Sequence, residues 1–491
     1  MTRIESLISE MTLTEKLGQL TMTACGYAVT GPVIAGDSTE AIKDGAIGNL
    51  LNLVGADHIR EMQDLAVKHS RLKIPLLIAL DVIHGLRTLF PIPLAEAATF
   101  DREIWERTAR AAAQEAAADG IAMTFSPMLD VARDPRWGRI AEGPGEDPWL
   151  ASQIALAKVR GYQGTDLAAA SALAACAKHY CGYGAVSAGR DYASVDISER
   201  TLHEVHMPAF RAAVGAGVAS VMPAFTDLAG IPMTVHRALL RDWLRGSYGF
   251  NGVIVSDYNS IGELLKHGVA ADLTEAATLA LRAGVDIDMM SNAYRTGLPL
   301  ALERGWVNIN EIDAAVRRVL TLKERLGLFD DPYRRGSVPE NLSVLSERRQ
   351  LARRASARSI VMLQNVRASL PLPSSLRRLA LLGPLADAAV EMGGCWGAAS
   401  KPDTHVSVRQ GLRAALPETD ITYAPGVAIN GDDQSQIAEA LDLCDRTDAI
   451  VLCLGESANM SGEAASRTDL DLPGLQRGFA QAVFESASTH G

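Results

Sequence analysis

Ionisable side chains stand at the ends of several short apolar runs, where they could act together as an acid, a base or a nucleophile. Asp81 ends the run 75–82, and His84 follows it. Lys178 and His179 lie in the run 174–181, and the run 252–258 closes with Ser256, Asp257 and Tyr258. Arg139 follows Trp137-Gly138 after a fourth run. Buried charges need a polar ligand or a tight network to satisfy them. Convergence of these groups would therefore mark a functional site.

A structural alternative exists for each of these residues taken singly. An aspartate at a strand end is most often a helix cap or an ion-pair partner. For Asp257 the capped helix would start at Asn259-Ser260. Arg136 is most simply a partner of nearby carboxylates. Only convergence of several charged groups on one face of the fold would weaken the interpretation of these residues as helix caps or ion-pair partners.

Other chemistries lack their sequence patterns. The six cysteines, at positions 25, 176, 181, 395, 444 and 453, include no Cys-x-x-Cys pair, so we expect buried reduced thiols and no zinc or redox motif. There is no His-Glu-x-x-His motif, no Gly-x-Ser-x-Gly elbow and no Walker-type loop. The glycines at 182 and 184 fall short of a dinucleotide fingerprint.

Composition restricts the class further. The 491 residues are 48% hydrophobic and 21% charged, as in chains with folded cores. The net charge of −11 disfavours a nucleic-acid partner. No stretch approaches the roughly 20 apolar residues that cross a membrane. The N-terminus has no secretory signal pattern, which predicts a cytoplasmic location, or a periplasmic one if a signal has been lost.

The elements that must position these residues alternate between strand-like and helix-like segments up to about residue 330. Runs that are apolar on successive residues, as in strands covered on both faces, lie at 47–54, 75–82, 121–131, 174–181, 218–225, 252–258 and 285–289. Helix-like segments such as 102–120 and 198–217 lie between them. This alternation predicts a (β/α)8 barrel of the TIM type over residues 1–330, with 308–329 as its last helix.

A second, smaller α/β unit is predicted at the C-terminal end. Residues 331–350 are rich in Pro, Gly, Ser and charge and indicate a linker. Strand-like runs resume at 359–365, 377–387 and 448–457, so we expect an α/β sandwich domain over 351–491.

Five ordered motifs carry a resemblance to a known family. They are LDVIHG, ARDPRWGRIAEGPGEDP, CAKHYCGYG, GVIVSDY and GEAASRTDLDLP. In this order they resemble glycoside hydrolase family 3, within it the β-glucosidases of bacterial periplasmic type. The family normally continues beyond the point where this chain ends, so the resemblance implies a C-terminally truncated second domain.

The resemblance implies roles for individual residues. Asp257 matches the catalytic nucleophile and Glu463 the acid/base, with neighbouring Glu456 as the main competitor. Sugar-binding positions are matched by Asp81, Arg139, Lys178, His179, Met222, Phe225, Tyr258 and Trp396. Phe225 replaces a tyrosine common in the family, and Trp396 is equally well explained as a core tryptophan.

The resemblance also implies a function. We expect an exo-acting retaining β-glycosidase, a β-glucosidase that releases terminal non-reducing β-D-glucose, with no cofactor and no metal. The alternatives are a β-xylosidase of the same family and a catalytically impaired sugar-binding fragment. The N-acetylglucosaminidase branch carries a histidine on the loop after His179, and this chain has none before His203. The expected partner is a β-glucoside or oligosaccharide, without nucleic acid or membrane, and a homo-oligomer is left open.

Overall fold

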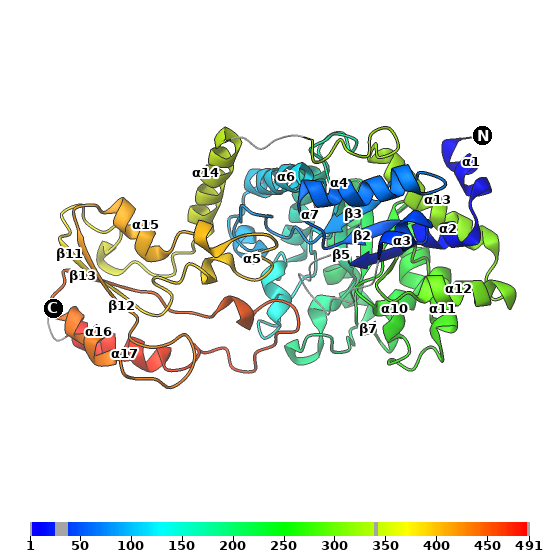
Figure 1. Ribbon diagram of the computed structural model, residues 1–491. Coiled ribbons are helices and arrows are strands. Elements are labelled where there is room, and N and C mark those ends of the chain that lie inside the picture. Colours follow the sequence, from blue (N-terminus) through cyan, green and yellow to red (C-terminus); the bar gives the residue numbers. More distant parts are fainter. Residues whose placement is uncertain (1, 25–37, 338–341, 489–491) are drawn as a thin grey trace.

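The computed structural model describes residues 2–24, 38–337 and 342–488. Cys25 and part of the predicted linker lie outside these ranges. Figure 1 shows a barrel built from the first two thirds of the chain, coloured blue to green, and a smaller sheet with its own helices, coloured yellow to red. The prediction of an α/β barrel followed by a second α/β unit is confirmed.

The barrel sheet has eight parallel strands in the described residues. In spatial order they are β10 (Asp288–Met289), β1 (Thr21–Ala24), β2 (Asn49–Leu51), β3 (Leu77–Leu80), β4 (Met123–Thr124), β5 (Ala174–Tyr180), β6 (Ser220–Pro223) and β9 (Val253–Ile254). A parallel bridge between Val255 and Ile287 joins the two ends of this sheet. The carboxyl ends of all its strands therefore meet on one face.

Helices cover the outside of the barrel, as the crossover between parallel strands requires. They are α1 (Arg3–Glu10), α2 (Leu13–Gln19), α3 (Ser38–Lys43), α4 (Ala56–Asp64), α5 (Pro93–Ala97), α6 (Arg102–Ala118), α7 (Pro148–Gln163), α8 (Glu199–Thr201), α9 (Pro208–Gly215), α10 (Ser260–Glu263), α11 (Leu273–Ala283), α12 (Ala293–Glu303) and α13 (Ile309–Arg325). Capping boxes begin α2, at Thr12 and Glu15, and α13, at Asn308 and Glu311. These local hydrogen bonds satisfy N–H groups that a helix start otherwise leaves unpaired.

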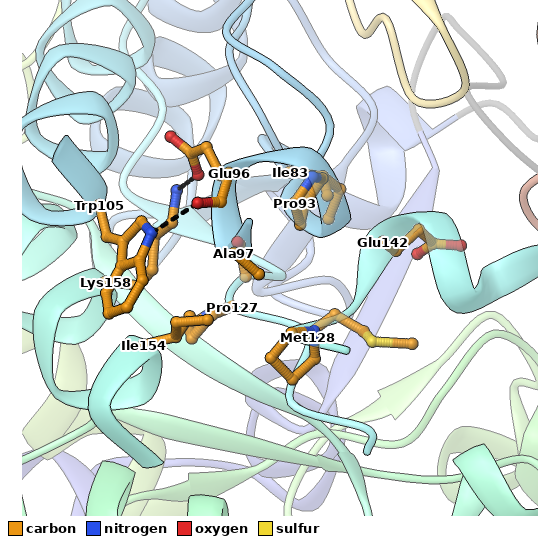
Figure 2. Close-up of a pocket in the computed structure, with 12 residues that line it drawn as sticks. Ile83, Pro93, Glu96, Ala97, Trp105, Pro127, Met128, Glu142, Ile154 and Lys158 are labelled. Atoms are coloured by element: carbon orange, nitrogen blue, oxygen red, sulfur yellow. Dashed lines mark hydrogen bonds and ion pairs between the residues drawn. The ribbon is translucent and has the colours of Figure 1, made fainter. Parts of the chain in front are cut away.

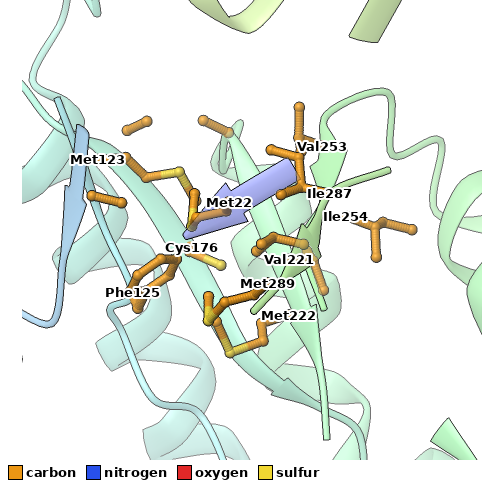
Figure 3. Close-up of a cluster of buried hydrophobic side chains, with 14 of the residues drawn as sticks. Met22, Met123, Phe125, Cys176, Val221, Met222, Val253, Ile254, Ile287 and Met289 are labelled. Carbon is orange, nitrogen blue, oxygen red and sulfur yellow. The ribbon is translucent and has the colours of Figure 1, made fainter. Parts of the chain in front are cut away.

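The barrel interior is filled by side chains rather than open. Figure 3 shows Met22, Met123, Cys176, Val221 and Met289 converging from different strands, and all five are buried. Met222, one of the predicted sugar-binding residues, belongs to the same cluster. This packing gives the strand ends a rigid base.

The smaller sheet is parallel, with the order β12-β11-β13 in the described residues. Its elements are α14 (Leu342–Ser359), β11 (Arg378–Leu382), α15 (Val408–Ala415), β12 (Asp420–Ala424), α16 (Ile437–Cys444), β13 (Ala449–Leu452) and α17 (Gln476–Ser488). The runs predicted at 377–387 and 448–457 thus contain β11 and β13. Helix α14 starts at Leu342, inside the segment predicted as linker.

Two sequence expectations are wrong in detail. Residues 360–365 form no strand, and Ile360 and Leu363 are 78% and 92% exposed, because no neighbouring strand in the described residues pairs with this apolar run. The single helix expected at 198–217 is interrupted: α8 runs into a π-helical turn over 202–206 before Pro208 starts α9. Proline cannot donate the main-chain hydrogen bond that would continue the first helix.

Candidate active site

Asp257 lies just beyond β9, at the carboxyl face of the barrel. Its backbone is held against the neighbouring strand, because the Ser256 N–H donates to the Ile287 carbonyl and the Met289 N–H donates to Ser256 Oγ at 2.8 Å. Asp257 Oδ1 accepts the Tyr258 N–H at 2.7 Å. The side chain does not cap α10, whose N-cap residue is Asn259. The helix-cap alternative therefore fails for this aspartate.

The second carboxylate oxygen of Asp257 is buried yet unpaired. Oδ2 has no hydrogen-bond partner within the described residues, and His179 Nε2 lies 3.6 Å away. Burial raises the pKa of Asp257 to about 7; the Glu463 charge acts in the same direction, and Arg139 and Lys178 oppose it. A buried polar atom without a partner is uncommon and calls for an explanation. An approaching electrophile would supply one.

Arg139 lies at the centre of the site and is almost fully buried. Its Nε and Nη2 donate to the two carboxylate oxygens of Glu142 at 2.9 and 3.1 Å. Nη2 also lies 3.1 Å from His179 Nε2, and Nη1 lies 3.7 Å from Glu463 Oε1. Burial acts to lower the pKa of Arg139, but the charges of Glu142 and Glu463 outweigh it and raise that pKa. The guanidinium is a buried positive charge that approaches Glu463 and also acts electrostatically on Asp257.

His179 is oriented by the Asp130 carboxylate, which contacts the ring nitrogen opposite the one that faces Arg139 and Asp257. Its Nδ1 lies 2.8 Å from Asp130 Oδ2, which also accepts the His179 main-chain N–H at 2.9 Å. Burial lowers the pKa of His179 well below its usual range, with Arg139 and Lys178 adding to the effect. A neutral ring that donates from Nδ1 to Asp130 leaves Nε2 free to accept from Arg139. This tautomer aligns the ring beside Asp257.

Lys178 and Asp81 form a buried ion pair beside this network, with Nζ 2.8 Å from Oδ1. Burial opposes the charge on Lys178, but the Asp81 carboxylate outweighs it, and the pKa of Lys178 is raised. The ammonium lies 4.9 Å from the centre of the Trp396 ring, and the Arg139 guanidinium lies 5.9 Å from it. Trp396 is thus a wall beside two cations rather than part of a separate core.

The Trp396 segment reaches the barrel through two main-chain contacts. His84 Nε2 lies 2.7 Å from the Cys395 carbonyl, and the Ala399 N–H donates to the Leu86 carbonyl at 3.1 Å. These contacts join the C-terminal unit to the loop after β3. Position 396 could not be assigned from sequence, because its environment comes from residues more than 200 positions away.

Glu463 comes from the C-terminal unit and meets the barrel at this face. Its Oε1 accepts the Tyr192 hydroxyl at 2.8 Å and lies 3.7 Å from Arg139 Nη1. The competing Glu456 is paired instead with Arg467, at 2.5 Å. The geometry therefore favours Glu463 over Glu456 as the second carboxylate of the site.

The remaining predicted residues lie around this network. Phe225 packs edge-on against Tyr192 and Tyr183, with ring centres 5.3 and 6.4 Å apart. Tyr258 is half-buried next to the nucleophile position, and burial raises its pKa. Met222 is 2% exposed, at the top of the barrel interior.

Several residues of the network were missed by sequence reasoning. Asp130 ends the apolar run 121–131 just as Asp81 ends its own, and this signal could have found it. Glu142 stands three positions after Arg139 in a short 3-10 turn, a spacing that brings two side chains together. Asp191 and Tyr192 gave no such local signal, since each has a partner in the C-terminal unit, at Ala464 and Glu463.

A small cavity lies behind Glu142. Figure 2 shows Lys158 and the Trp105 ring meeting Glu96 on one side of it, with Glu142 apart on another. Lys158 Nζ forms an ion pair with Glu96, and Trp105 Nε1 donates to the Glu96 carbonyl at 2.8 Å. This buried pair joins α5 to α7 behind the turn that carries Arg139.

Comparison with known proteins identifies two family regions. Residues 12–322 match the glycosyl hydrolase family 3 N terminal domain, and residues 360–489 match the glycosyl hydrolase family 3 C-terminal domain. None of the helices in the described residues is both long and apolar enough to span a bilayer.

Individual relatives agree with these matches. A periplasmic beta-glucosidase from Salmonella typhimurium is 39% identical over 98% of this chain and 66% of its own length. A beta-xylosidase from Formosa agariphila is 36% identical over 92% of this chain and 66% of its own. A mutant beta-glucosidase from Listeria innocua, solved in complex with laminaribiose, has a TM-score of 0.92 at 37% identity and covers 100% of this chain and 69% of its own. The chain spans about two thirds of the length of these relatives.

Proposed function

The chain belongs to glycosyl hydrolase family 3, and from that premise we propose that it is an exo-acting retaining β-glycosidase whose principal substrate is a β-glucoside. The observation that carries this proposal is a pair of carboxylates that approach two touching side chains, Asp257 beside His179 and Glu463 beside Arg139. One of them, Asp257, keeps a buried oxygen without a partner in the described residues. The other, Glu463, approaches Arg139 Nη1 to 3.7 Å from the C-terminal unit.

In the first step, Asp257 Oδ2 attacks the anomeric carbon of the terminal sugar. A covalent bond forms between this oxygen and the carbon as the bond to the leaving oxygen breaks. Glu463, in its protonated form, gives its proton to the leaving oxygen, and the aglycone departs as an alcohol. The Tyr192 hydroxyl supports this geometry by fixing Oε1 of Glu463.

In the second step, the Glu463 carboxylate takes a proton from water. The water oxygen bonds to the anomeric carbon, and the bond to Asp257 breaks, so that the carboxylate is regenerated. Two inversions release the sugar with the β configuration. Arg139 and Lys178 stay positively charged throughout, which stabilises the departing carboxylate.

Binding of the sugar is assigned to the charged groups that surround Asp257. Asp81 accepts hydrogen bonds from hydroxyls, and Lys178 and Arg139 donate to them. Trp396, placed beside both cations, offers an apolar face to the ring or the leaving group. Phe225, Tyr258 and Met222 complete the lining in this proposal.

A β-xylosidase is the second candidate, because one of the relatives above carries that name. The two substrates differ by one hydroxymethyl group, and a difference of this size is worth only about 1–3 kcal/mol in an apolar pocket. A screen of nitrophenyl β-glucoside, β-xyloside and β-N-acetylglucosaminide, with laminaribiose as a natural-type substrate, distinguishes the candidates. Preference for the glucoside in kcat/KM supports the proposal, and binding without turnover identifies a sugar-binding protein. The cytoplasmic or periplasmic location expected from the sequence stays a prediction, which cell fractionation would test.

A further inference from the structure

Asp191 is a half-buried carboxylate that the mechanism above does not use. Its Oδ1 accepts the Trp137 indole N–H at 2.8 Å and the Tyr183 hydroxyl at 2.7 Å. Its Oδ2 accepts the Ala464 main-chain N–H at 2.7 Å. One carboxylate therefore joins two barrel side chains to the residue that directly follows Glu463.

The neighbours of Asp191 reinforce this connection. The Asp191 main-chain N–H donates to Ser466 Oγ at 2.9 Å. The next residue, Tyr192, donates its hydroxyl to Glu463 Oε1 at 2.8 Å. The pair Asp191-Tyr192 thus holds the loop of the acid/base candidate at its main chain and at its carboxylate.

The barrel side of the connection is rigid. Trp137 and Tyr183 are fully buried, and their rings pack with centres 5.0 Å apart. The Tyr183 ring also packs edge-on against His179, at 5.2 Å, and lies 5.5 Å from the Arg139 guanidinium. Buried indole and phenol groups need an acceptor, and Asp191 supplies it for both. The same carboxylate is therefore fixed relative to Arg139 and His179.

We propose that Asp191 is a positioning residue, which sets the location of Glu463 over the barrel without touching the substrate. This inference rests on the proposed acid/base role of Glu463. A carboxylate suits the task because it can accept on both oxygens at once. An amide at this position accepts on one oxygen only and turns an NH2 group toward either the Ala464 N–H or the two aromatic donors. Asp191→Asn thus keeps the shape of the side chain and breaks one half of the connection.

The activity test compares Asp191→Asn with the wild-type protein on two substrates. Proton donation matters most for a poor leaving group, so displacement of Glu463 should lower kcat on laminaribiose about 100-fold and on dinitrophenyl β-glucoside less than about 5-fold. The KM for the activated substrate should change little, since the sugar-binding groups stay in place. The alkaline limb of the pH profile should become shallower. Asp227→Asn is the matched control, because Asp227 is also half-buried and accepts a main-chain N–H, from Gly230 at 3.0 Å. Asp227 lies in the hairpin formed by β7 (Asp227–Leu228) and β8 (Ile231–Pro232).

Hydrogen exchange measures the position of the loop independently of turnover. The Ala464 amide and the peptide 456–470 should exchange at least 10-fold faster in Asp191→Asn than in the wild type or Asp227→Asn. Ser466→Ala, which removes only the bond to the Asp191 N–H, should give a smaller change in the same direction. Ser466→Ala therefore tests the anchoring of the loop even if Asp191→Asn does not fold.

The outcomes separate this inference from the proposed function. Equal losses of kcat on both substrates, or unchanged exchange at Ala464, overturn the positioning role. If Glu463→Ala itself shows no leaving-group discrimination, the acid/base role of Glu463 fails. Faster exchange in Asp191→Asn would in that case still support the anchoring of the loop by Asp191.

Discussion

The groups around Asp257, the proposed nucleophile, set its protonation and its orientation. Buried beside His179 and under the opposing charges of Glu463 and Arg139, it has a pKa raised to about 7, mainly by burial. One oxygen is fixed by the Tyr258 N–H, and the other is unpaired within the described residues. A carboxylate held in this way would lose little rotational freedom in the proposed attack on the anomeric carbon.

The first prediction is that Asp257→Ala abolishes turnover and leaves the fold intact. The side chain stands at the barrel mouth, so its removal opens no cavity in the packed interior. Turnover should fall by several orders of magnitude, because no covalent intermediate can form. Steady-state kinetics and thermal unfolding of this variant, with the exposed Asp196→Ala as control, provide the measurement. Retention of more than about a tenth of wild-type activity, roughly 1.4 kcal/mol of barrier, would contradict the assignment.

The second prediction concerns the pH dependence of stability. The folded-state pKa of Asp257 is raised from its usual 3.8 to about 7, so between these values the folded protein keeps a proton that the unfolded chain has released. This contribution is full below pH 4 and is lost as the pH rises through 7, at about 1.4 kcal/mol per pH unit. Asp257→Asn removes the titration. Its melting temperature relative to wild type should therefore increase from pH 5 to pH 8, while Asp196→Asn shows no such trend. A constant difference across this range would count against the raised pKa.

The third prediction is that Glu463→Ala discriminates between leaving groups. A poor leaving group needs a proton, and a good one departs without it. Hydrolysis of a disaccharide should thus fall far more than hydrolysis of dinitrophenyl β-glucoside. Azide should partly rescue the activated substrate, since an anion needs no general base. Glu456→Ala is the matched control, because Glu456 pairs with Arg467. The same pattern in Glu456→Ala would transfer the role to that residue.

At the scale of elements, the acid/base loop docks against the turn that precedes Arg139. The Gly138 N–H donates to the Ala465 carbonyl at 2.9 Å, and the Gly462 N–H donates to the Gly138 carbonyl at 2.8 Å. Trp137 and Ser466 form an antiparallel bridge beside them. The C-terminal unit thus pairs a short extended segment with a barrel loop. The paired residues Gly138 and Gly462 are 324 positions apart in the sequence.

The fourth prediction tests this close approach at Gly138. A Cβ atom there would lie 2.5 Å from the Ala465 carbonyl oxygen and 2.7 Å from that of Gly462, so the loop must move away. Gly138→Ala should lower kcat on laminaribiose more than on dinitrophenyl β-glucoside. Gly411→Ala in α15, where nothing lies within 4 Å of the added atom, is the matched control. Equal kinetics of the two variants would mean that the loop tolerates the displacement.

At the scale of the whole molecule, the candidate site exists only where two units meet. The barrel supplies Asp81, Arg139, Lys178, His179 and Asp257, and the C-terminal unit supplies Trp396 and Glu463. Figure 1 shows the loops of the C-terminal unit extending toward the barrel between α5 and the lower barrel loops. Because the second carboxylate arrives with another unit, its approach to Asp257 is set by the docking of that unit.

The fifth prediction follows from this docking and concerns stereochemistry. Carboxyl groups about 5–5.5 Å apart give retention, whereas a pair about 6.5–9.5 Å apart leaves room for a water and gives inversion. We expect retention, since Glu463 Oε1 lies 3.7 Å from Arg139, Asp257 Oδ2 lies 3.6 Å from His179, and Arg139 and His179 are themselves 3.1 Å apart. Proton NMR of the early product should detect the β anomer before mutarotation. Initial release of the α anomer would remove Asp257 from the nucleophile role.

The sequence by itself determined the barrel and one side of the site. Apolar runs that end in Asp81 or Asp257 predict parallel strands with polar carboxyl ends. A strand buried on both faces shows as a continuous apolar run, which can be recognised from the local sequence. That such ends meet on one face follows from the barrel itself. The same pattern would have found Asp130, which ends its run in the same way.

The tertiary structure alone decided the contacts between distant segments. Apart from the family motif, no pattern of residue types distinguishes Glu463 from Glu456. In the folded chain Glu463 accepts from Tyr192 of the barrel, whereas Glu456 pairs with Arg467 of its own unit. The role of Asp191 depends on its contact with the Ala464 N–H, which lies 273 positions later in the chain. The strand predicted over 359–365 does not form for the same reason, since a strand needs a neighbouring strand, and the hydrophobic pattern of one segment does not identify that neighbour. Local patterns specify elements, and long-range packing specifies which of their side chains meet.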